Sequence, residues 1–114
     1  MRVVAFNGSA RPDGNTARMI EEVFVELRGA GIDCEQVTLA GQRLHGCTAC
    51  YRCKKEKDRR CHGPVDAVAD CIAKMDAADG ILLASPTYFA DVTAEIKALV
   101  DRSGMTARAN DDML

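Results

Sequence analysis

Short apolar runs alternate with longer amphipathic stretches along this chain. Residues 3–6 are apolar and stop at the turn sequence 7–9, which predicts a buried parallel strand rather than a helix. An apolar stripe with helical spacing follows, and it predicts a helix that ends near Gly29 and Gly31. The stripe consists of Met19, Ile20, Val23, Phe24 and Leu27.

The same alternation of strand and helix occurs twice more. Residues 32–39 mix apolar and polar positions, which predicts a second strand nearer the sheet edge, and residues 81–84 predict a third, buried strand. A helix is predicted later in each unit, the last one capped by Thr93 or Asp91. The apolar positions that predict these helices are Val65, Val68, Cys71, Ile72 and Met75, and then Val92, Ile96, Leu99 and Val100.

Three strand-to-helix units predict an α/β fold, in which a parallel sheet carries helices on its faces and right-handed crossovers join the strands. In such sheets ligands bind beyond the carboxyl ends of the strands. The loops after the first and third strands are therefore the candidate binding loops.

The loop at residues 8–16 lies between a strand and a predicted helix start, where free N–H groups favour an anion. Ser9, Asn15 and Thr16 add neutral donors and Arg11 adds a cation, which suits a phosphate monoester. The nucleoside-triphosphatase and dinucleotide glycine motifs are both missing. The alternative is a polar connector in which Thr16 or Asn15 caps the helix.

Two aromatic residues follow the third strand, within the segment Ser85-Pro-Thr-Tyr-Phe89. An exposed Tyr-Phe pair at this edge needs a flat ring or another subunit to cover it. A phosphate loop beside an aromatic platform indicates a mononucleotide with a planar head, and FMN fits both features.

Four of the six cysteines lie within fifteen residues and form a candidate ligand set. Four thiolates with two-residue spacings favour an iron-sulfur cubane, while zinc and disulfides stay open as alternatives. The four are Cys47, Cys50, Cys53 and Cys61. His45 and His62 flank this set and are interpreted as surface residues, and Tyr51 within it is a candidate shield against water. The isolated Cys34 and Cys71 are predicted to be core residues.

Composition limits the function classes. With 47% hydrophobic and 28% charged residues, the 114 residues suit one soluble globular domain, and the N-terminal apolar run is too short for a signal peptide or membrane span. We therefore expect a cytoplasmic protein. A net charge of −2 and few aromatic residues argue against nucleic-acid and membrane binding. Residues 54–60 nevertheless carry five basic and two acidic side chains, which either dock an acidic electron donor or form a solvated loop.

The segments 8–16 and 85–102 resemble the FMN-binding signatures of the NADPH-dependent FMN reductase family, which has a flavodoxin-like, doubly wound fold. The cysteine-rich loop, residues 46–62, resembles that of the iron-sulfur flavoproteins in this family, which carry a [4Fe-4S] cluster. The resemblance implies one flavodoxin-like FMN-binding domain, residues 1–114, with strand order 2-1-3. It also implies that the phosphate binds Ser9, Arg11, Asn15 and Thr16, and that the ring lies against Pro86, Thr87, Tyr88 and Phe89.

Family members continue into two further strands, whereas this chain stops at Leu114. The third strand would then be a bare apolar edge, which natural proteins avoid. We expect either that the chain is a fragment of a longer protein or that a partner chain covers this edge, as in a homo-oligomer.

The first functional hypothesis is a flavoprotein containing FMN and a [4Fe-4S] cluster, which transfers electrons between a one-electron donor and a two-electron acceptor. Its redox donor would be a protein such as ferredoxin, or NAD(P)H, and no side chain acts as a catalytic acid or base. The alternatives are an NAD(P)H-dependent FMN or quinone reductase whose cysteines bind zinc or nothing, and a non-enzymatic metal-binding fragment.

Overall fold

The computed structural model describes residues 1–114 and contains three strands and four helices. The strands are β1 (Arg2–Asn7), β2 (Asp33–Thr38) and β3 (Gly80–Ala84). The helices are α1 (Asn15–Gly29), α2 (Arg52–Glu56), α3 (Val68–Asp76) and α4 (Ala94–Ala109).

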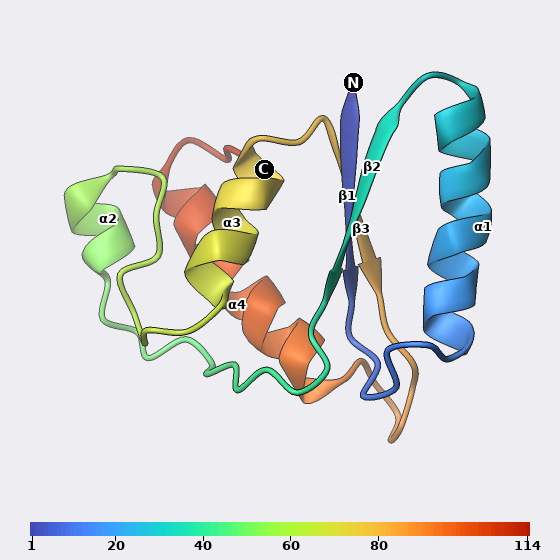
Figure 1. Cartoon of the computed structure of the whole chain (residues 1–114). Coiled ribbons are helices and arrows are strands. Elements are labelled where there is room, and N and C mark those ends of the chain that lie inside the picture. Colours follow the sequence, from blue (N-terminus) through green and yellow to red (C-terminus); the bar gives the residue numbers. More distant parts are fainter.

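The sheet is parallel, as the residue pattern predicts, and its strand order is β2-β1-β3, as the family resemblance implies. Helix α1 covers one face, and α3 and α4 cover the other (Figure 1). The predicted α/β class, with helices on both faces of a parallel sheet, is therefore confirmed.

Residues 3–6 of β1 form an uninterrupted apolar run, which suits a strand that is buried on both faces. Its residues alternate between two cores: Val4 and Phe6 pack with α3 and α4, and Val3 and Ala5 pack with α1. The remaining buried apolar residues on the α3 and α4 side are Leu39, Val68, Cys71, Ile72, Met75, Ile96 and Leu99, and on the α1 side they are Ile20 and Phe24.

Several predicted helix positions differ in the structure. Val65 lies before α3 and is fully exposed, and Val92 precedes the Thr93 cap of α4 and is 43% exposed. On α1, Met19 and Val23 are exposed, whereas Ile20 and Phe24 are buried against the sheet and Leu27 packs beside them. Helix α4 also continues to Ala109, well beyond the last apolar residue of its predicted stripe.

Helix α2 was not predicted, because it overlaps the charged segment 54–60, which suggested a solvated loop. The helix is a single turn, and it buries Cys53 while its lysines stay exposed. The Cys53 thiol lies 3.7 Å from the carbonyl oxygen of Met105 on α4. One buried cysteine thus faces α4, and the charged side chains of α2 face solvent.

The outer edge of β3 pairs with no strand, and Leu83 on it is 49% exposed. Apolar residues of β3, α3 and α4, together with Leu114 beyond α4, line an open groove beside this edge: Met75, Ile81, Leu83, Val100, Ala107 and Leu114. That a further segment or a partner chain covers the edge stays a prediction. None of the helices combines the length and the apolar character that a membrane crossing requires.

Candidate functional site

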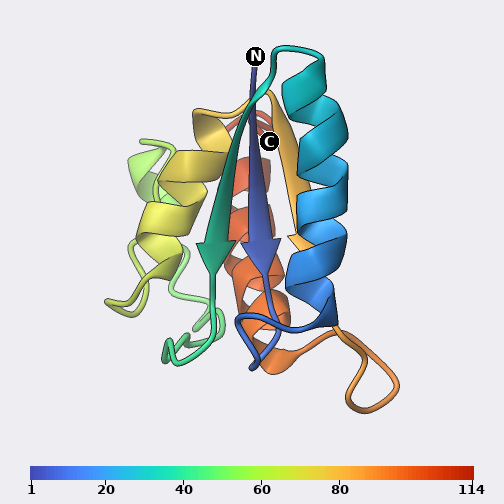
Figure 2. The same ribbon diagram turned by 45° about the vertical axis from the view of Figure 1, so that its right-hand side comes forward.

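The loops after β1 and β3 lie side by side at the carboxyl edge of the sheet (Figure 2). The Gly8 N–H donates a hydrogen bond to the Ala84 carbonyl over 2.8 Å. The Ala10 N–H donates to the hydroxyl oxygen of Tyr88 over 3.0 Å. These two bonds tie both predicted FMN-binding loops into one surface.

Side-chain oxygens hold the first loop in shape. The Asn7 side-chain oxygen accepts a hydrogen bond from the Ser9 N–H at 2.9 Å, and the Ser9 hydroxyl accepts one from the Arg11 N–H at 3.1 Å. Helix α1 begins after Gly14 with no side-chain cap. The alternative in which Asn15 or Thr16 caps the helix is therefore wrong, and both side chains remain available to a ligand.

A cavity of about 260 Å³ opens between the two loops. Six of the eight predicted FMN-binding residues line it, whereas Thr87 and Phe89 do not. The lining residues are Ser9, Arg11, Gly14, Asn15, Thr16, Pro86 and Tyr88. Pockets for whole small molecules commonly measure about 300–1,000 Å³, so this cavity suits the phosphate end of a ligand whose remainder lies outside it.

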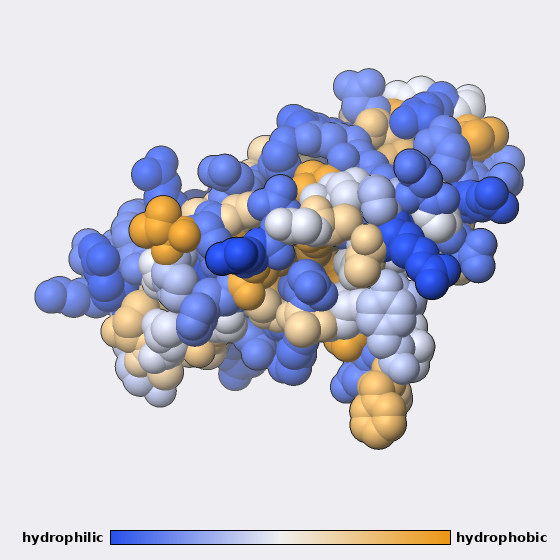
Figure 3. Space-filling view, turned by 60° about the horizontal axis from the view of Figure 1, so that its bottom comes forward, coloured by the Kyte–Doolittle hydropathy of each residue, from blue (hydrophilic) through white to orange (hydrophobic).

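Tyr88 and Phe89 are 61% and 91% exposed. Figure 3 turns this edge of the molecule toward the viewer and shows an apolar side chain projecting from a largely polar surface. The pKa of Tyr88 is lowered, first by the nearby Ser9 hydroxyl and then by the Ala10 N–H that its oxygen accepts. The two rings are thus free to contact a planar group above the sheet edge.

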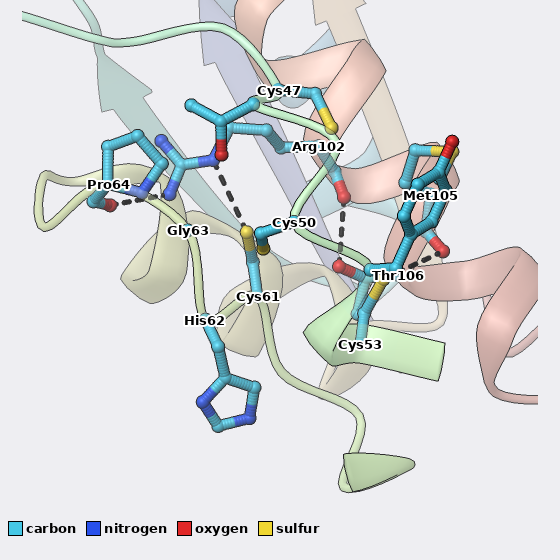
Figure 4. Close-up of a pocket in the computed structure, with 12 residues that line it drawn as sticks. Cys47, Cys50, Cys53, Cys61, His62, Gly63, Pro64, Arg102, Met105 and Thr106 are labelled. Carbon is cyan, nitrogen blue, oxygen red and sulfur yellow. Dashed lines mark hydrogen bonds between the residues drawn. The ribbon is translucent and has the colours of Figure 1, made fainter. Parts of the chain in front are cut away.

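The four clustered cysteines line one pocket between the cysteine-rich loop and α4 (Figure 4). None of them forms a disulfide. No three side chains of the His, Cys, Asp or Glu type are gathered closely enough in the structure to hold a metal ion. The structure brings Cys47, Cys50, Cys53 and Cys61 to one pocket, but the four sulfurs do not form a finished ligand set, so their role as metal ligands stays a prediction.

The chemistry around these sulfurs suits a four-thiolate cluster. The Ala49 N–H lies 3.4 Å from Cys47 Sγ, and the Arg102 Nε–H donates to Cys61 Sγ over 3.3 Å. Ala49 and Tyr51 adopt left-handed backbone conformations on either side of Cys50. Such turns direct backbone N–H groups toward anions, and they recur around iron-sulfur sites. Hydrogen bonds of this kind stabilise the negative charge of cluster thiolates.

Arg102 is the main functional residue that the sequence analysis missed. Its side chain is 1% exposed and bonds both carboxylate oxygens of Asp66, at 2.6 and 2.7 Å. Burial alone would raise the pKa of Asp66, but N–H donors from His45 and Val68, together with Arg102, hold it below its ordinary value. The available signal was a charged residue three positions after Leu99, on the apolar face of α4.

The remaining cysteine, histidine and tyrosine residues singled out in the sequence differ in burial. Cys71 is buried in the core, and burial raises the pKa of its thiol to about 11. Cys34 is half-buried against the core on the α1 side. The His45 side chain is exposed, as predicted, whereas His62 is half-buried and its ring bonds Asp58 at 2.8 Å, pointing away from the cysteines (Figure 4). Tyr51 lines the cysteine pocket but is 55% exposed, so its shielding role stays a prediction.

Comparisons with known proteins agree with this geometry. The family model described as NADPH-dependent FMN reductase matches residues 1–114. An iron-sulfur flavoprotein of Methanocaldococcus jannaschii is 41% identical over 90% of this chain and 52% of its own length. Relatives with the same name from Archaeoglobus fulgidus and Methanosarcina thermophila are 30% and 29% identical, over 90% and 96% of this chain and 45% and 56% of their own lengths.

The chain thus spans about half the length of the curated relatives that it matches. The match to the family model, in contrast, extends over every residue, and the order of strands and binding loops agrees with it. The chain therefore belongs to the NADPH-dependent FMN reductase family.

Proposed function

We propose that this protein is a redox flavoprotein that binds FMN and a [4Fe-4S] cluster, and that it transfers electrons between a one-electron donor and a two-electron acceptor. The observation that carries the proposal is the presence of two separate sites in one small domain. Six FMN-signature residues line a cavity at the sheet edge, and four free cysteines line a pocket against α4. The family match and the names of the relatives support both sites.

In this proposal the FMN phosphate binds at the start of α1. Arg11 supplies a positive charge, and Ser9, Asn15 and Thr16 supply hydrogen-bond donors beside the free N–H groups of the helix. The ring lies outside the cavity against residues 86–89, where the exposed aromatic side chains stack on it. Bound FMN supplies the conversion between one-electron and two-electron transfer.

The cluster would bind Cys47, Cys50, Cys53 and Cys61. An absorption spectrum of anaerobically purified protein, with iron, sulfide and zinc analysis, tests the whole assignment. We expect flavin bands over a broad iron-sulfur absorption that a reductant bleaches. Flavin without iron would instead indicate a flavin or quinone reductase, and a colourless zinc protein would indicate a metal-binding module.

Cys50→Ser separates the two cofactors. Because Cys50 lines the cysteine pocket and not the FMN cavity, this variant should lose iron and keep FMN. Cys34→Ser is the matched control: it also replaces an incompletely buried cysteine, but one that lies beside α1, so it should retain both cofactors. Loss of both cofactors from Cys50→Ser alone would contradict the assignment of two separate sites.

We further propose that an acidic electron donor, ferredoxin-like in its charge, docks on the basic segment 54–60. Within this segment Lys55, Lys57 and Arg60 are exposed and belong to no ion pair. Association between opposite charges weakens steeply with ionic strength. Reduction by the protein donor should therefore slow in salt and in Lys55→Gln/Lys57→Gln, whereas Arg28→Gln on the opposite face should have little effect. Equal rates in all three proteins would exclude this surface.

We also propose that the protein acts as a homo-oligomer, because the exposed Tyr88 and Phe89 and the unpaired edge of β3 leave room for another chain. Light scattering at several concentrations measures the subunit count directly. A monomer at all concentrations would refute this part of the proposal and leave the cofactor assignment unchanged.

A further inference from the structure

Arg102 makes contacts with every one of its side-chain nitrogens. Nε donates to Cys61 Sγ at 3.3 Å, and Nη2 donates to the Pro64 carbonyl at 2.8 Å. Nη1 donates to both oxygens of Asp66 and, over 3.1 Å, to the His45 carbonyl. Figure 4 shows the guanidinium extending from α4 toward Cys61 and Pro64. A planar group with fixed donors therefore joins Cys61 of the cysteine-rich loop to three residues that flank this loop: His45, Pro64 and Asp66.

These contacts lie on both sides of the cysteines in the chain. His45 precedes Cys47, whereas Pro64 and Asp66 follow Cys61. Between those points α2 is the only helix or strand. The carboxylate of Asp66 also accepts the His45 N–H at 2.8 Å and the Val68 N–H at 3.0 Å, so the same ion pair fixes the start of α3.

A purely structural role does not explain the direction of Nε. Removing an ion pair from water is costly, and apolar residues of similar size often hold a segment equally well. Asp66 pairs with Nη1 alone, and Nε points instead at the sulfur of Cys61. Next to it, an added Cβ on Gly63 would lie 3.5 Å from Cys61 Sγ and 3.9 Å from Arg102 Nε, which shows how closely the backbone approaches this pair.

We propose that Arg102 is a positioning residue for Cys61, and that its Nε–H donates a hydrogen bond to the Cys61 thiolate and raises the reduction potential of the cluster. This inference rests on the proposed function. Reduction adds one electron from the reductant to the cluster and makes its sulfurs more negative. A donor hydrogen bond to a cluster sulfur stabilises the reduced form more than the oxidised form, which makes the potential more positive.

Two double variants isolate the hydrogen bond. Arg102→Met/Asp66→Asn removes both charges and the donor. Arg102→Gln/Asp66→Asn also removes both charges, but the glutamine amide nitrogen occupies the place of Nε along the side chain and can still donate. Replacing both members of a buried pair avoids leaving Asp66 charged and unpaired. Arg108→Gln, at an exposed position on the same helix, is the matched control.

The measurement is a redox titration of the cluster followed by electron paramagnetic resonance, with iron, sulfide and FMN content for each protein. We expect the methionine double variant to lower the equilibrium constant for reduction by roughly tenfold, which is about 59 mV for one electron. The glutamine double variant should recover much of this shift, and Arg108→Gln should match the unaltered protein. Loss of iron from the methionine variant alone, with FMN retained in both, would also support the inference.

Two outcomes would overturn the proposed role of Arg102. Equal potentials in the unaltered protein and both double variants would show that the Nε contact has no effect on the cluster. Failure of both double variants to fold, when Arg108→Gln folds, would assign Arg102 a structural role only. If the unaltered protein contains no iron or sulfide, the proposed function itself fails, and this result is distinct from unchanged potentials in a loaded protein.

Discussion

Replacing Gly8 with alanine tests how closely the loop after β1 packs against the start of α4. A Cβ on residue 8 would stand 2.8 Å from Thr93 Oγ1 and 2.9 Å from Ile96 Cδ1, and closer still to Ile96 Cγ1. Carbon atoms in favourable contact are about 3.5–4.0 Å apart. Ile96 is buried and Thr93 caps α4, so neither can withdraw without moving the helix.

We expect Gly8→Ala to lower the free energy of unfolding by about 1–3 kcal/mol, the usual cost of overpacking a filled core. Because two buried side chains obstruct the new methyl group, the upper part of this range is expected. Gly104→Ala on α4 is the control, since an added Cβ there meets nothing within 4 Å. That exposed helical position should instead gain about 0.5–1 kcal/mol.

Denaturant unfolding followed by circular dichroism measures both effects, provided that the slope of the unfolding free energy against denaturant concentration is the same in all variants. Ile96→Ala removes the two obstructing carbons, so the double variant with Gly8→Ala should lose less stability than the sum of the single variants. Binding of FMN, measured by quenching of its fluorescence, should weaken in Gly8→Ala because Gly8 begins the phosphate loop, residues 8–16. Stability equal to that of the unaltered protein, or strictly additive costs, would refute the reasoning.

Two further predictions use the pKa shifts. Burial raises the pKa of Cys71 to about 11, so iodoacetamide at pH 8 should label the exposed Cys47 and Cys50 of cofactor-free protein much faster than Cys71; equal labelling by mass spectrometry would contradict this burial. Hydrogen bonds from Lys74 and then Arg2 lower the pKa of Glu35, so the stability that its carboxylate contributes is complete at neutral pH and is lost as the pH falls through that lowered pKa. Glu35→Gln should therefore reduce the loss of stability in acid, and an unchanged acid profile would show that these bonds contribute nothing.

The parts of the fold predicted from sequence follow from local patterns and from rules of parallel sheets. The uninterrupted apolar run of β1 indicates burial on both faces, and turn residues after β1 and β3 mark the carboxyl edge where loops meet. These rules bring the loops after β1 and β3 together although they are far apart in the sequence. Ser9 and Tyr88 line one cavity, and the Ala10 N–H bonds Tyr88, which is 78 positions away. Clustering in sequence likewise predicts that the four cysteines share a site.

The missed features depend on contacts between distant segments. Helix α2 forms in a charged segment because Cys53 packs on α4. A single helical turn is too short to produce a periodic pattern of apolar residues, so the sequence does not predict it. Arg102 bonds groups 36 to 57 positions away, so its role becomes visible only when α4 lies against the cysteine-rich loop. Val65 and Val92 were wrongly predicted as buried helix positions. Both lie just before a helix, where an apolar residue does not have to face the core.

Helix α4 connects the two proposed cofactor sites. Thr93 and Ile96 at its start lie against Gly8 of the phosphate loop, and Arg102 further along holds Cys61. Thr93 and Arg102 are nine positions apart, which is about 13 Å along the helix axis at about 1.5 Å per residue. The cysteine-rich loop itself contains only the short α2, so it cannot fix the distance between the sites. A continuous helix can, so changes at Thr93 or Ile96 should affect FMN and changes at Arg102 should affect the cluster, whereas an insertion between these positions should disturb both cofactors.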